Sequence, residues 1–399
     1  MKYNPAEKLQ DYLVFGEFGE VNPSITDSST FTFLSFDKMQ ELFDHEIEGC
    51  FLYSRHLNPI NDFLARALAL LENTEAAQVT ASGMAAISCA LLQILNSGDE
   101  IVSSRTIYGG TYALFKNFFP KIGIETKFVN TCNLDSVEKA ITNKTKVLYF
   151  ESISNPLLEV ADIAALRRIA DAYNLKIVVD NTFSPMLITP SNYGADVVIH
   201  SLTKFINGAS DCVAGCICSS KDFINSLRNV NSGAVMLLGP TMDSLRAASV
   251  LKNMHTLHIR LKQHSKNALI MATELENLGL KTFYPGLKSH PQHDLMESLL
   301  NPGFGFGGML AFDVKNEEVS HQLLTRMQEE LVGYFAVSLG FYKTLFSSPG
   351  TSTSSEIPKE EQIAMGMSGS LVRMSVGLDN DIYKSVGRVE KCLREMKVI

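Results

Sequence analysis

The sequence predicts an α/β protein with a mostly parallel central sheet and a smaller α+β C-terminal domain. Short runs of β-branched residues alternate with helical patterns between residues 76 and 220. Strands separated by helices in this way usually form a parallel sheet that helices cover on both faces. Farther along, a strand pattern at 309–314 is mixed with helical patterns near 315–331 and 380–396, which predicts the smaller domain.

The individual elements follow from local spacing. Met84, Ile87, Leu91 and Leu95 recur at helical intervals, and a second helical pattern covers residues 163–173. A single long helix is predicted from about 242 to 278, leading out of the sheet. The clearest strands are residues 100–104, 146–150, 176–180 and 196–200.

Three parts of the chain differ in pattern. Residues 1–60 lack sustained periodicity and are rich in Ser, Thr, Phe and Asn, which is typical of an extended arm. Residues 61–256 carry the alternating strands and helices and would form a large domain. Residues 257–399 would form the small C-terminal domain.

The composition excludes several classes of protein. The chain has 399 residues, of which 45% are hydrophobic and 20% charged, with a net charge of -8. An acidic chain without a run of Lys and Arg is not expected to bind nucleic acid. No segment approaches the roughly 18 consecutive apolar residues of a membrane span, and the first residues lack a signal-peptide pattern. We therefore expect a cytoplasmic protein with reduced cysteines.

Three cysteines, Cys212, Cys216 and Cys218, lie within one short stretch. A metal site would need ligands on turns and a second cluster, or histidines, at a set spacing. The stretch instead alternates small and β-branched residues, which is typical of a buried strand with free thiols as small apolar groups. We predict no metal site.

Two short motifs have attractive but unsupported interpretations. Residues 303–308 match G-x-G-x-x-G, yet they follow Pro302 and precede a predicted strand, whereas a dinucleotide fingerprint follows a strand and opens a helix. Ser201 and Lys204 match S-x-x-K, but the partner motifs S-D-N and K-T-G of penicillin-recognising enzymes are absent from the sequence. Neither function is predicted.

Lys204 has a more informative context. It directly follows the predicted strand 196–200, at the edge of an open α/β sheet where ligands usually bind. A lysine that is desolvated there has a lowered pKa, so its free amine is available for Schiff-base chemistry. Asp180 ends another strand, and a carboxylate there could pair with a protonated pyridine nitrogen. For an isolated lysine, a surface position at the start of a loop would be the preferred interpretation.

Further residues at the same edge favour the cofactor hypothesis. Ser82, Gly83 and Met84 open a predicted helix, whose unpaired N–H groups could receive a phosphate. Ser201 and Thr203 flank Lys204 with hydroxyl groups suited to the same phosphate. The aromatic ring of Tyr108, after another strand, could stack on a cofactor ring.

These residues lie in stretches that resemble the Cys/Met-metabolism family of enzymes dependent on pyridoxal phosphate (PLP). The resemblance runs from about Tyr53 to the C-terminus and, within the family, is strongest to plant-type methionine γ-lyases. It implies a fold-type I architecture with an arm, a large cofactor domain and a small C-terminal domain. It also implies a homotetramer of two dimers with shared active sites. The matching motifs are Tyr53-Ser-Arg55, Ser82-Gly-Met84, Tyr108-Gly-Gly-Thr111, Phe150-Glu-Ser152, Asn155-Pro156, Val179-Asp-Asn-Thr182, Ser201-Leu-Thr-Lys204, Val337-Ser-Leu-Gly340 and Leu371-Val-Arg373.

The resemblance assigns roles to the matched positions. Lys204 would carry PLP as a Schiff base and move protons, and Tyr108 would stack on the ring and assist protonation of the leaving group. Asp180 would hold the pyridine nitrogen. Arg373 would grip the substrate carboxylate with its planar fork. The other cofactor-binding residues would be Gly83, Met84, Thr182, Ser201 and Thr203, with Tyr53 and Arg55 from the neighbouring subunit; Ser338, Asn155 and Val337 would lie beside the substrate.

Departures from the family bear on the substrate. Many bacterial methionine γ-lyases carry Cys where this chain has Gly110, and a Lys-Asp pair is replaced by Asn229-Val230. Cystathionine γ-lyases carry Glu before the active-site serine, whereas this chain has Val337, an apolar wall that suits the methyl thioether of methionine. Cleavage of methionine to methanethiol, 2-oxobutanoate and ammonia is therefore the leading expectation. Cystathionine β- or γ-lyase activity comes next, then cystathionine γ-synthase activity; a PLP-binding protein without turnover is the alternative from another class.

Overall fold

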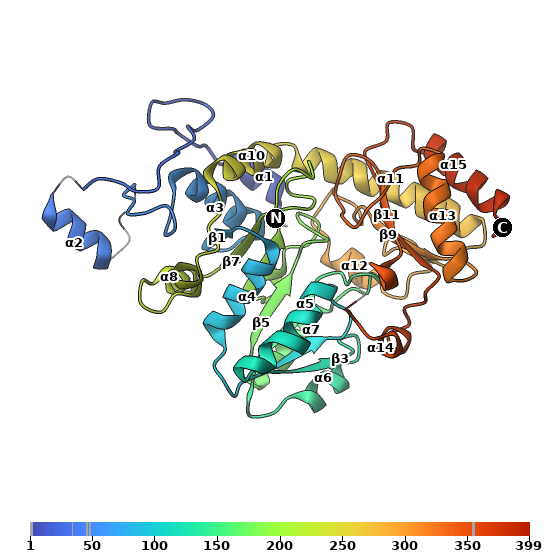
Figure 1. The fold of residues 1–399 in the computed structure, drawn as a ribbon, viewed down its shortest axis with the longest axis horizontal. Coiled ribbons are helices and arrows are strands. Elements are labelled where there is room, and N and C mark those ends of the chain that lie inside the picture. The colour runs from blue at the N-terminus through green and yellow to red at the C-terminus, as the bar shows by residue number, and fades with distance from the viewer. Residues whose placement is uncertain (1–2, 34, 45–46, 48, 353–355) are drawn as a thin grey trace.

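The computed structural model describes residues 3–33, 35–44, 47, 49–352 and 356–399. Six positions of the predicted arm, residues 1–60, lie outside the described residues: 1, 2, 34, 45, 46 and 48. Two sheets organise the chain, one in each of two lobes that lie side by side in Figure 1. Among the described helices, none is long and apolar enough to cross a membrane.

The first sheet has seven strands in the order β1-β7-β6-β5-β4-β2-β3. Only β7 runs antiparallel to its neighbours, so the prediction of a mostly parallel sheet is confirmed. The strands are β1 (Ala76–Thr80), β2 (Glu100–Ser104), β3 (Glu125–Val129), β4 (Thr145–Glu151), β5 (Lys176–Asp180), β6 (Val197–Ser201) and β7 (Gly215–Ser219).

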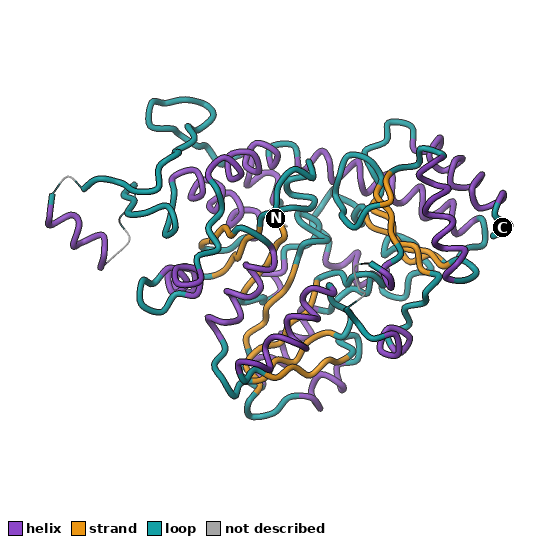
Figure 2. Tube along the Cα trace, viewed as in Figure 1, coloured by secondary structure: helices purple, strands orange, loops and turns teal. Residues whose placement is uncertain are grey.

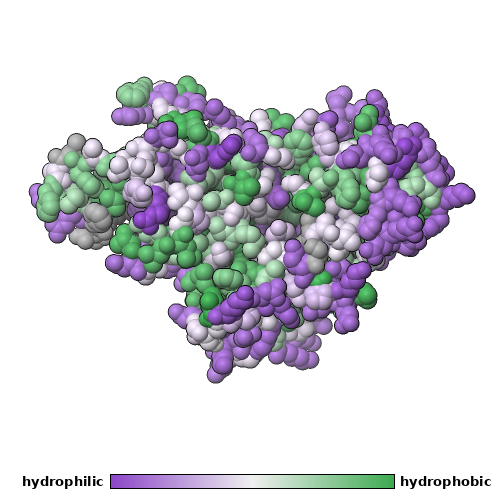
Figure 3. All heavy atoms as spheres, viewed as in Figure 1, coloured by the Kyte–Doolittle hydropathy of each residue, from purple (hydrophilic) through white to green (hydrophobic). Residues whose placement is uncertain are grey.

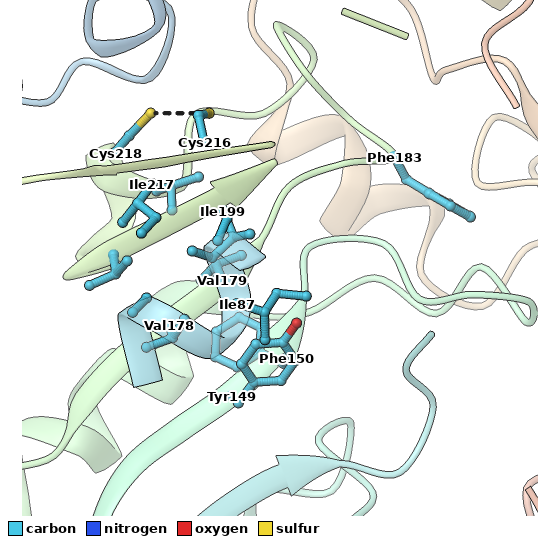
Figure 4. Close-up of a cluster of buried hydrophobic side chains, with 14 of the residues drawn as sticks. Ile87, Tyr149, Phe150, Val178, Val179, Phe183, Ile199, Cys216, Ile217 and Cys218 are labelled. Atoms are coloured by element: carbon cyan, nitrogen blue, oxygen red, sulfur yellow. Dashed lines mark hydrogen bonds between the residues drawn. The ribbon is translucent and has the colours of Figure 1, made fainter. Parts of the chain in front are cut away.

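Helices cover this sheet (Figure 1). Helices α3 (Pro59–Glu72), α4 (Gly83–Ile94) and α7 (Ile163–Ala172) pack against its strands, and α5 (Gly109–Ala113) packs against α4. Apolar side chains of α4 and of β4 to β7 fill the space between these layers (Figure 4). The remaining helices of this lobe are α6 (Leu134–Ala140), α8 (Lys221–Arg228), α9 (Ala234–Leu238) and α10 (Ser244–Met254).

Two cysteines of the cysteine-rich stretch lie in β7, as expected, and Cys212 precedes this strand. Cys216 and Cys218 are fully buried on one face of this strand, and their sulfur atoms lie 3.9 Å apart (Figure 4). The glycine-rich motif at 303–308 is a loop that leads into strand β9, not into a helix, so its rejection as a dinucleotide fingerprint is also confirmed.

The second sheet lies in the C-terminal lobe (Figure 2). Its order is β10-β11-β12-β9-β8, and a separate apolar core joins it to the neighbouring helices. The strands are β8 (Thr282–Phe283), β9 (Met309–Asp313), β10 (Tyr334–Phe335), β11 (Leu345–Ser347) and β12 (Leu371–Ser375), and the helices are α11 (Leu257–Asn277), α12 (His293–Leu299), α13 (Glu317–Glu329), α14 (Lys359–Ala364) and α15 (Ile382–Glu395).

The prediction of one helix over 242–278 was wrong, because the chain forms α10 and α11 with a break at residues 255–256. No Gly or Pro marks the break. The guanidinium of Arg260 instead donates to the carbonyl oxygen of Asn253 at 2.8 Å and to that of Phe205 at 2.6 Å. A side chain thereby binds a carbonyl that a continuous helix would use for its own backbone ladder.

The prediction of an extended arm over residues 1–60 missed two helices. Helices α1 (Pro5–Gln10) and α2 (Phe36–Asp44) lie within it. The Asn4 side chain caps α1, Pro5 occupies its first turn, and α1 packs against α3. A helix of six residues has too few positions to show a periodic pattern, so only its Asn-Pro start marks it in the sequence.

Candidate active site

The carboxyl ends of neighbouring parallel strands bring the predicted residues to one edge of the first sheet. Asp180 ends β5 and lies in register with Glu151, which ends β4. Ser201 ends β6, and Lys204 follows in the adjoining turn. Because adjacent parallel strands end side by side, residues far apart in sequence meet here.

Lys204 contacts the second lobe. Its ammonium nitrogen donates to the hydroxyl of Ser338 at 3.3 Å. Burial, followed by the positive charge of Arg373, lowers the pKa of Lys204 to about 8. A larger fraction of its amine is therefore uncharged near neutral pH than for an exposed lysine, which is the form that acts as a nucleophile or base.

Asp180 is buried at the end of β5. Its Oδ1 accepts a hydrogen bond from the backbone N–H of Thr182 at 3.0 Å. The hydroxyl of Thr182 accepts from the backbone N–H of Ser201 at 2.8 Å, which ties the end of β5 to that of β6. Burial raises the pKa of Asp180, so a nearby cation would stabilise its carboxylate form.

The floor of this region fits a cofactor ring. Asp180 is buried there beside the hydroxyl of Tyr149, and burial raises the pKa of Asp180. A pyridine ring with a protonated nitrogen against Asp180 would stabilise this buried carboxylate, so the residues present suit PLP.

The start of α4 fits a phosphate. Ser82 caps this helix by accepting from the N–H of Ala85 at 3.0 Å. A Cβ at Gly83 would lie 2.8 Å from the Cβ of Ser201, so only glycine allows the helix start to approach β6 so closely. The unpaired N–H groups of this first turn are suited to a phosphate, and Met84 follows Gly83 there. The hydroxyl of Thr203 is engaged with the backbone of Ala214, so it would have to turn to donate to a phosphate.

Tyr108 precedes α5, and its ring remains 42% exposed in one chain. A Cβ at Gly110 would come within 2.6 Å of the Tyr108 ring. The glycine at this position therefore permits the observed ring orientation, which a cysteine there would displace. Burial, followed by the charge of Glu356, raises the pKa of Tyr108, so its phenol stays protonated near neutral pH.

Arg373 lies in β12 and is only 3% exposed. Its Nη1 donates to the side-chain oxygen of Asn155 at 3.0 Å. Burial lowers the pKa of Arg373 to about 10, which leaves the guanidinium charged at neutral pH. Ser338 belongs to the same lobe as Arg373 and lies beside Lys204 of the first lobe, and its neighbour Val337 is 58% exposed. The guanidinium of Arg373, the amine of Lys204 and the hydroxyl of Ser338 thus share one region between the two lobes.

Glu151 is a site residue that the sequence interpretation did not single out. Its buried carboxylate accepts the backbone N–H of Tyr108 at 2.7 Å and that of Asn155 at 2.9 Å. Glu151 belonged to one of the family motifs. Its position at the end of a predicted strand, like that of Asp180, could have identified Glu151 as a candidate site residue.

Tyr53 and Arg55 are not brought to this site within one chain. Arg55 donates to the carbonyl oxygen of Met236 at 2.7 Å and lies over the ring of Tyr53. Tyr53 forms an isolated β-bridge with Thr30. Their predicted role in the neighbouring subunit's phosphate site remains a prediction.

Comparisons with known proteins agree with this geometry. The family model for Cys/Met metabolism PLP-dependent enzymes matches residues 10–384. A methionine γ-lyase of Arabidopsis thaliana is 43% identical over 96% of this chain and 88% of its own length. A cystathionine γ-lyase of Bacillus subtilis is 36% identical over 85% of this chain and 87% of its own length.

A solved structure agrees as well. It is described as an O-acetylhomoserine (thiol)-lyase of Campylobacter jejuni that carries a pyridoxyl-lysine phosphate, and it superimposes with a TM-score of 0.91 at 28% identity. The match covers 98% of this chain and 100% of that one. The expected fold-type I architecture is therefore confirmed, and the cofactor is pyridoxal phosphate. The chain belongs to the Cys/Met metabolism family of PLP-dependent enzymes.

Proposed function

We propose that this enzyme is a methionine γ-lyase that converts methionine and water to methanethiol, 2-oxobutanoate and ammonia. The observation that carries the proposal is the position of Val337, an uncharged side chain directly beside Ser338, where Lys204 and the second lobe meet. The similarity to the Arabidopsis methionine γ-lyase supports it. Detection of methanethiol and 2-oxobutanoate from methionine tests it.

The residues would hold the cofactor as follows. Lys204 would bind PLP covalently, and Asp180 would pair with the protonated pyridine nitrogen. Gly83, Met84, Thr182, Ser201 and Thr203 would lie around the phosphate and the ring, with Tyr108 stacked on the ring. When bound, PLP supplies an electron sink that makes the protons of the substrate acidic.

The same residues would move the protons. The substrate carboxylate would bind to Arg373, which Asn155 holds at 3.0 Å, with Ser338 beside it. Lys204, with its lowered pKa, would take the proton from Cα of the substrate. Tyr108 keeps its phenol proton near neutral pH because burial raises its pKa, so it or Lys204 would protonate the departing sulfur.

The apolar neighbour of Ser338 provides a test of substrate choice. Methionine and cystathionine share the carboxylate and the α-amine, so discrimination must come from groups beyond the sulfur. Val337→Glu should pair with the distal ammonium of cystathionine and raise its kcat/KM relative to methionine about tenfold to a hundredfold, because a charged hydrogen bond contributes about 1.5–3 kcal/mol.

Val337→Leu serves as the matched control, since it changes size without adding charge and should leave the ratio within about threefold. Steady-state kinetics with both substrates measures the ratio of kcat/KM for cystathionine to that for methionine. An unchanged ratio in Val337→Glu would remove Val337 as the determinant. A wild-type enzyme that cleaves cystathionine but ignores methionine would favour the cystathionine lyase assignment.

We also propose a homotetramer of two dimers in which Tyr53 and Arg55 complete the partner's phosphate site. One chain exposes many apolar side chains on the arm and near α9 and α10, and Figure 3 shows such side chains gathered over this part of the molecule. The most exposed are Leu13, Phe15, Phe18, Val21, Phe36, Leu237, Leu238 and Leu245. Patches of this kind usually mark a subunit interface.

A mixing experiment tests this sharing of residues. Arg55→Ala and Lys204→Ala should each be nearly inactive, because each disables both sites of its own dimer. After the two variants are unfolded and refolded together, hybrid dimers should regain one intact site, giving about a quarter of wild-type activity. Arg66→Ala, on the exposed side of α3, is the control and should stay active alone. An active monomer, or mixing that restores nothing, would contradict the proposal.

A cytoplasmic location is part of the proposal. All seven cysteines are free thiols in the structure, which is the state expected in a reducing compartment.

A further inference from the structure

Glu151 links two parts of the site through its two carboxylate oxygens. Oε1 accepts the backbone N–H of Tyr108 at 2.7 Å, and Oε2 accepts the backbone N–H of Asn155 at 2.9 Å. The side chain of Asn155 in turn accepts from Nη1 of Arg373 at 3.0 Å. Glu151 thus fixes the backbone of Tyr108 and the backbone of Asn155, whose side chain holds Arg373.

This carboxylate is costly to the fold. Glu151 is only 7% exposed, and its strand neighbour in register, Asp180, is a second buried acid. Burial, followed by the charge of Asp180, raises the pKa of Glu151 well above its usual range, while the two N–H donors and Arg373 act in the opposite direction. An apolar side chain would avoid this penalty but would leave the N–H groups of Tyr108 and Asn155 without their acceptor. The position therefore requires an acceptor with two oxygens.

We propose that Glu151 is a positioning residue that orients Arg373, through Asn155, for two-point binding of the substrate carboxylate, and orients Tyr108 at the same time. The inference rests on the proposed function of Arg373 as the carboxylate-binding residue. Glu151 contacts neither the substrate nor the cofactor in this scheme. It orients Arg373 and Tyr108, which make those contacts. Small errors in the orientation of Arg373 weaken a bidentate hydrogen bond to the carboxylate.

Binding of glycine to the PLP-loaded enzyme isolates this effect. Glycine has the amine and the carboxylate of the substrates but no side chain to cleave, and its binding changes the absorbance of the bound cofactor. Glu151→Gln keeps the shape of the side chain but turns an amide N–H₂ toward one of the two backbone N–H groups. We expect the Kd for glycine and the KM for amino-acid substrates to rise about tenfold or more, with a smaller change in kcat.

Glu159→Gln is the matched control. Glu159 lies in the loop after β4 and accepts the hydroxyl of Thr106 at 2.7 Å, so its replacement should leave the Kd for glycine within about twofold. Cofactor content and thermal stability are measured for both variants. An equal loss in the two variants would indicate general loosening of the loop and would overturn the proposal.

A double-mutant cycle tests the route through Asn155. Asn155→Ala removes the oxygen that holds Arg373 but keeps the backbone N–H that Glu151 accepts. If Glu151 acts through Asn155, the double variant should bind glycine about as weakly as Asn155→Ala alone. Additive losses, or an unchanged Kd in Glu151→Gln, would overturn the proposal.

Two features of the design keep its outcome clear. If Glu151→Gln does not fold, Glu151→Asp shortens the reach to both donors while keeping the carboxyl group, and the same loss of glycine affinity is expected. Glycine binding does not depend on which carbon–sulfur bond the enzyme breaks. A wild-type enzyme that ignores methionine would therefore refute the proposed substrate without deciding the role of Glu151.

Discussion

Lys204→Ala should lose covalently bound cofactor and reduce turnover by roughly a thousandfold or more. The amine of Lys204 would both hold PLP and move protons, and a positioned acid or base alone contributes typically about 10²–10⁴-fold to a rate. The lowered pKa of Lys204, about 8, gives this amine the uncharged form that both tasks require. The change should be visible as a loss of the yellow colour of the protein.

Borohydride reduction followed by peptide mapping measures this directly. In the wild type the reduced cofactor should be found on Lys204. Lys262→Ala is a suitable control, because this lysine lies over the ring of Phe304 in the second lobe and should not affect cofactor content. A cofactor fixed to another lysine would show that the site has been assigned to the wrong residue.

Arg373→Leu should lower kcat/KM about thirtyfold to several-thousandfold, mostly through a higher KM. The leucine leaves the substrate carboxylate without its partner in a buried region, and removing one member of such a pair costs about 2–5 kcal/mol. The side-chain oxygen of Asn155 would also lose the hydrogen bond that it now accepts from Arg373 at 3.0 Å.

Steady-state kinetics with methionine, together with cofactor content, measures the effect. Cofactor content should stay near that of the wild type, because Arg373 binds the substrate in this account and not PLP. Arg168→Leu, on the exposed side of α7, should behave like the wild type. A variant that lost cofactor but kept its KM would assign Arg373 to the cofactor instead.

Strand ends could be predicted from the sequence because the signals are local. Strand β5, which ends at Asp180, and strand β6, which precedes Lys204, are both short and rich in β-branched residues. A parallel sheet places the carboxyl ends of such neighbouring strands together. The helix start at Gly83 was equally accessible, since Ser82 is a standard capping residue.

Tertiary contacts set the features that were not predicted. The break between α10 and α11 follows from the reach of Arg260 to the carbonyl oxygen of Asn253, which no local pattern reveals. The role of Glu151 depends on backbone N–H groups of Tyr108 and Asn155, which belong to separate loops. The positions of Tyr53 and Arg55 relative to the phosphate depend on a second subunit and stay a prediction.

Product analysis tests the central claim most directly. The purified enzyme, loaded with PLP, is incubated separately with methionine, cystathionine, cysteine and O-acetylhomoserine plus a thiol, and 2-oxo acids, thiols and ammonia are quantified. The account predicts equal amounts of methanethiol, 2-oxobutanoate and ammonia from methionine, with a kcat/KM for methionine above that for cystathionine. Cleavage of cystathionine without cleavage of methionine, or formation of a new thioether from O-acetylhomoserine as the main reaction, would contradict it.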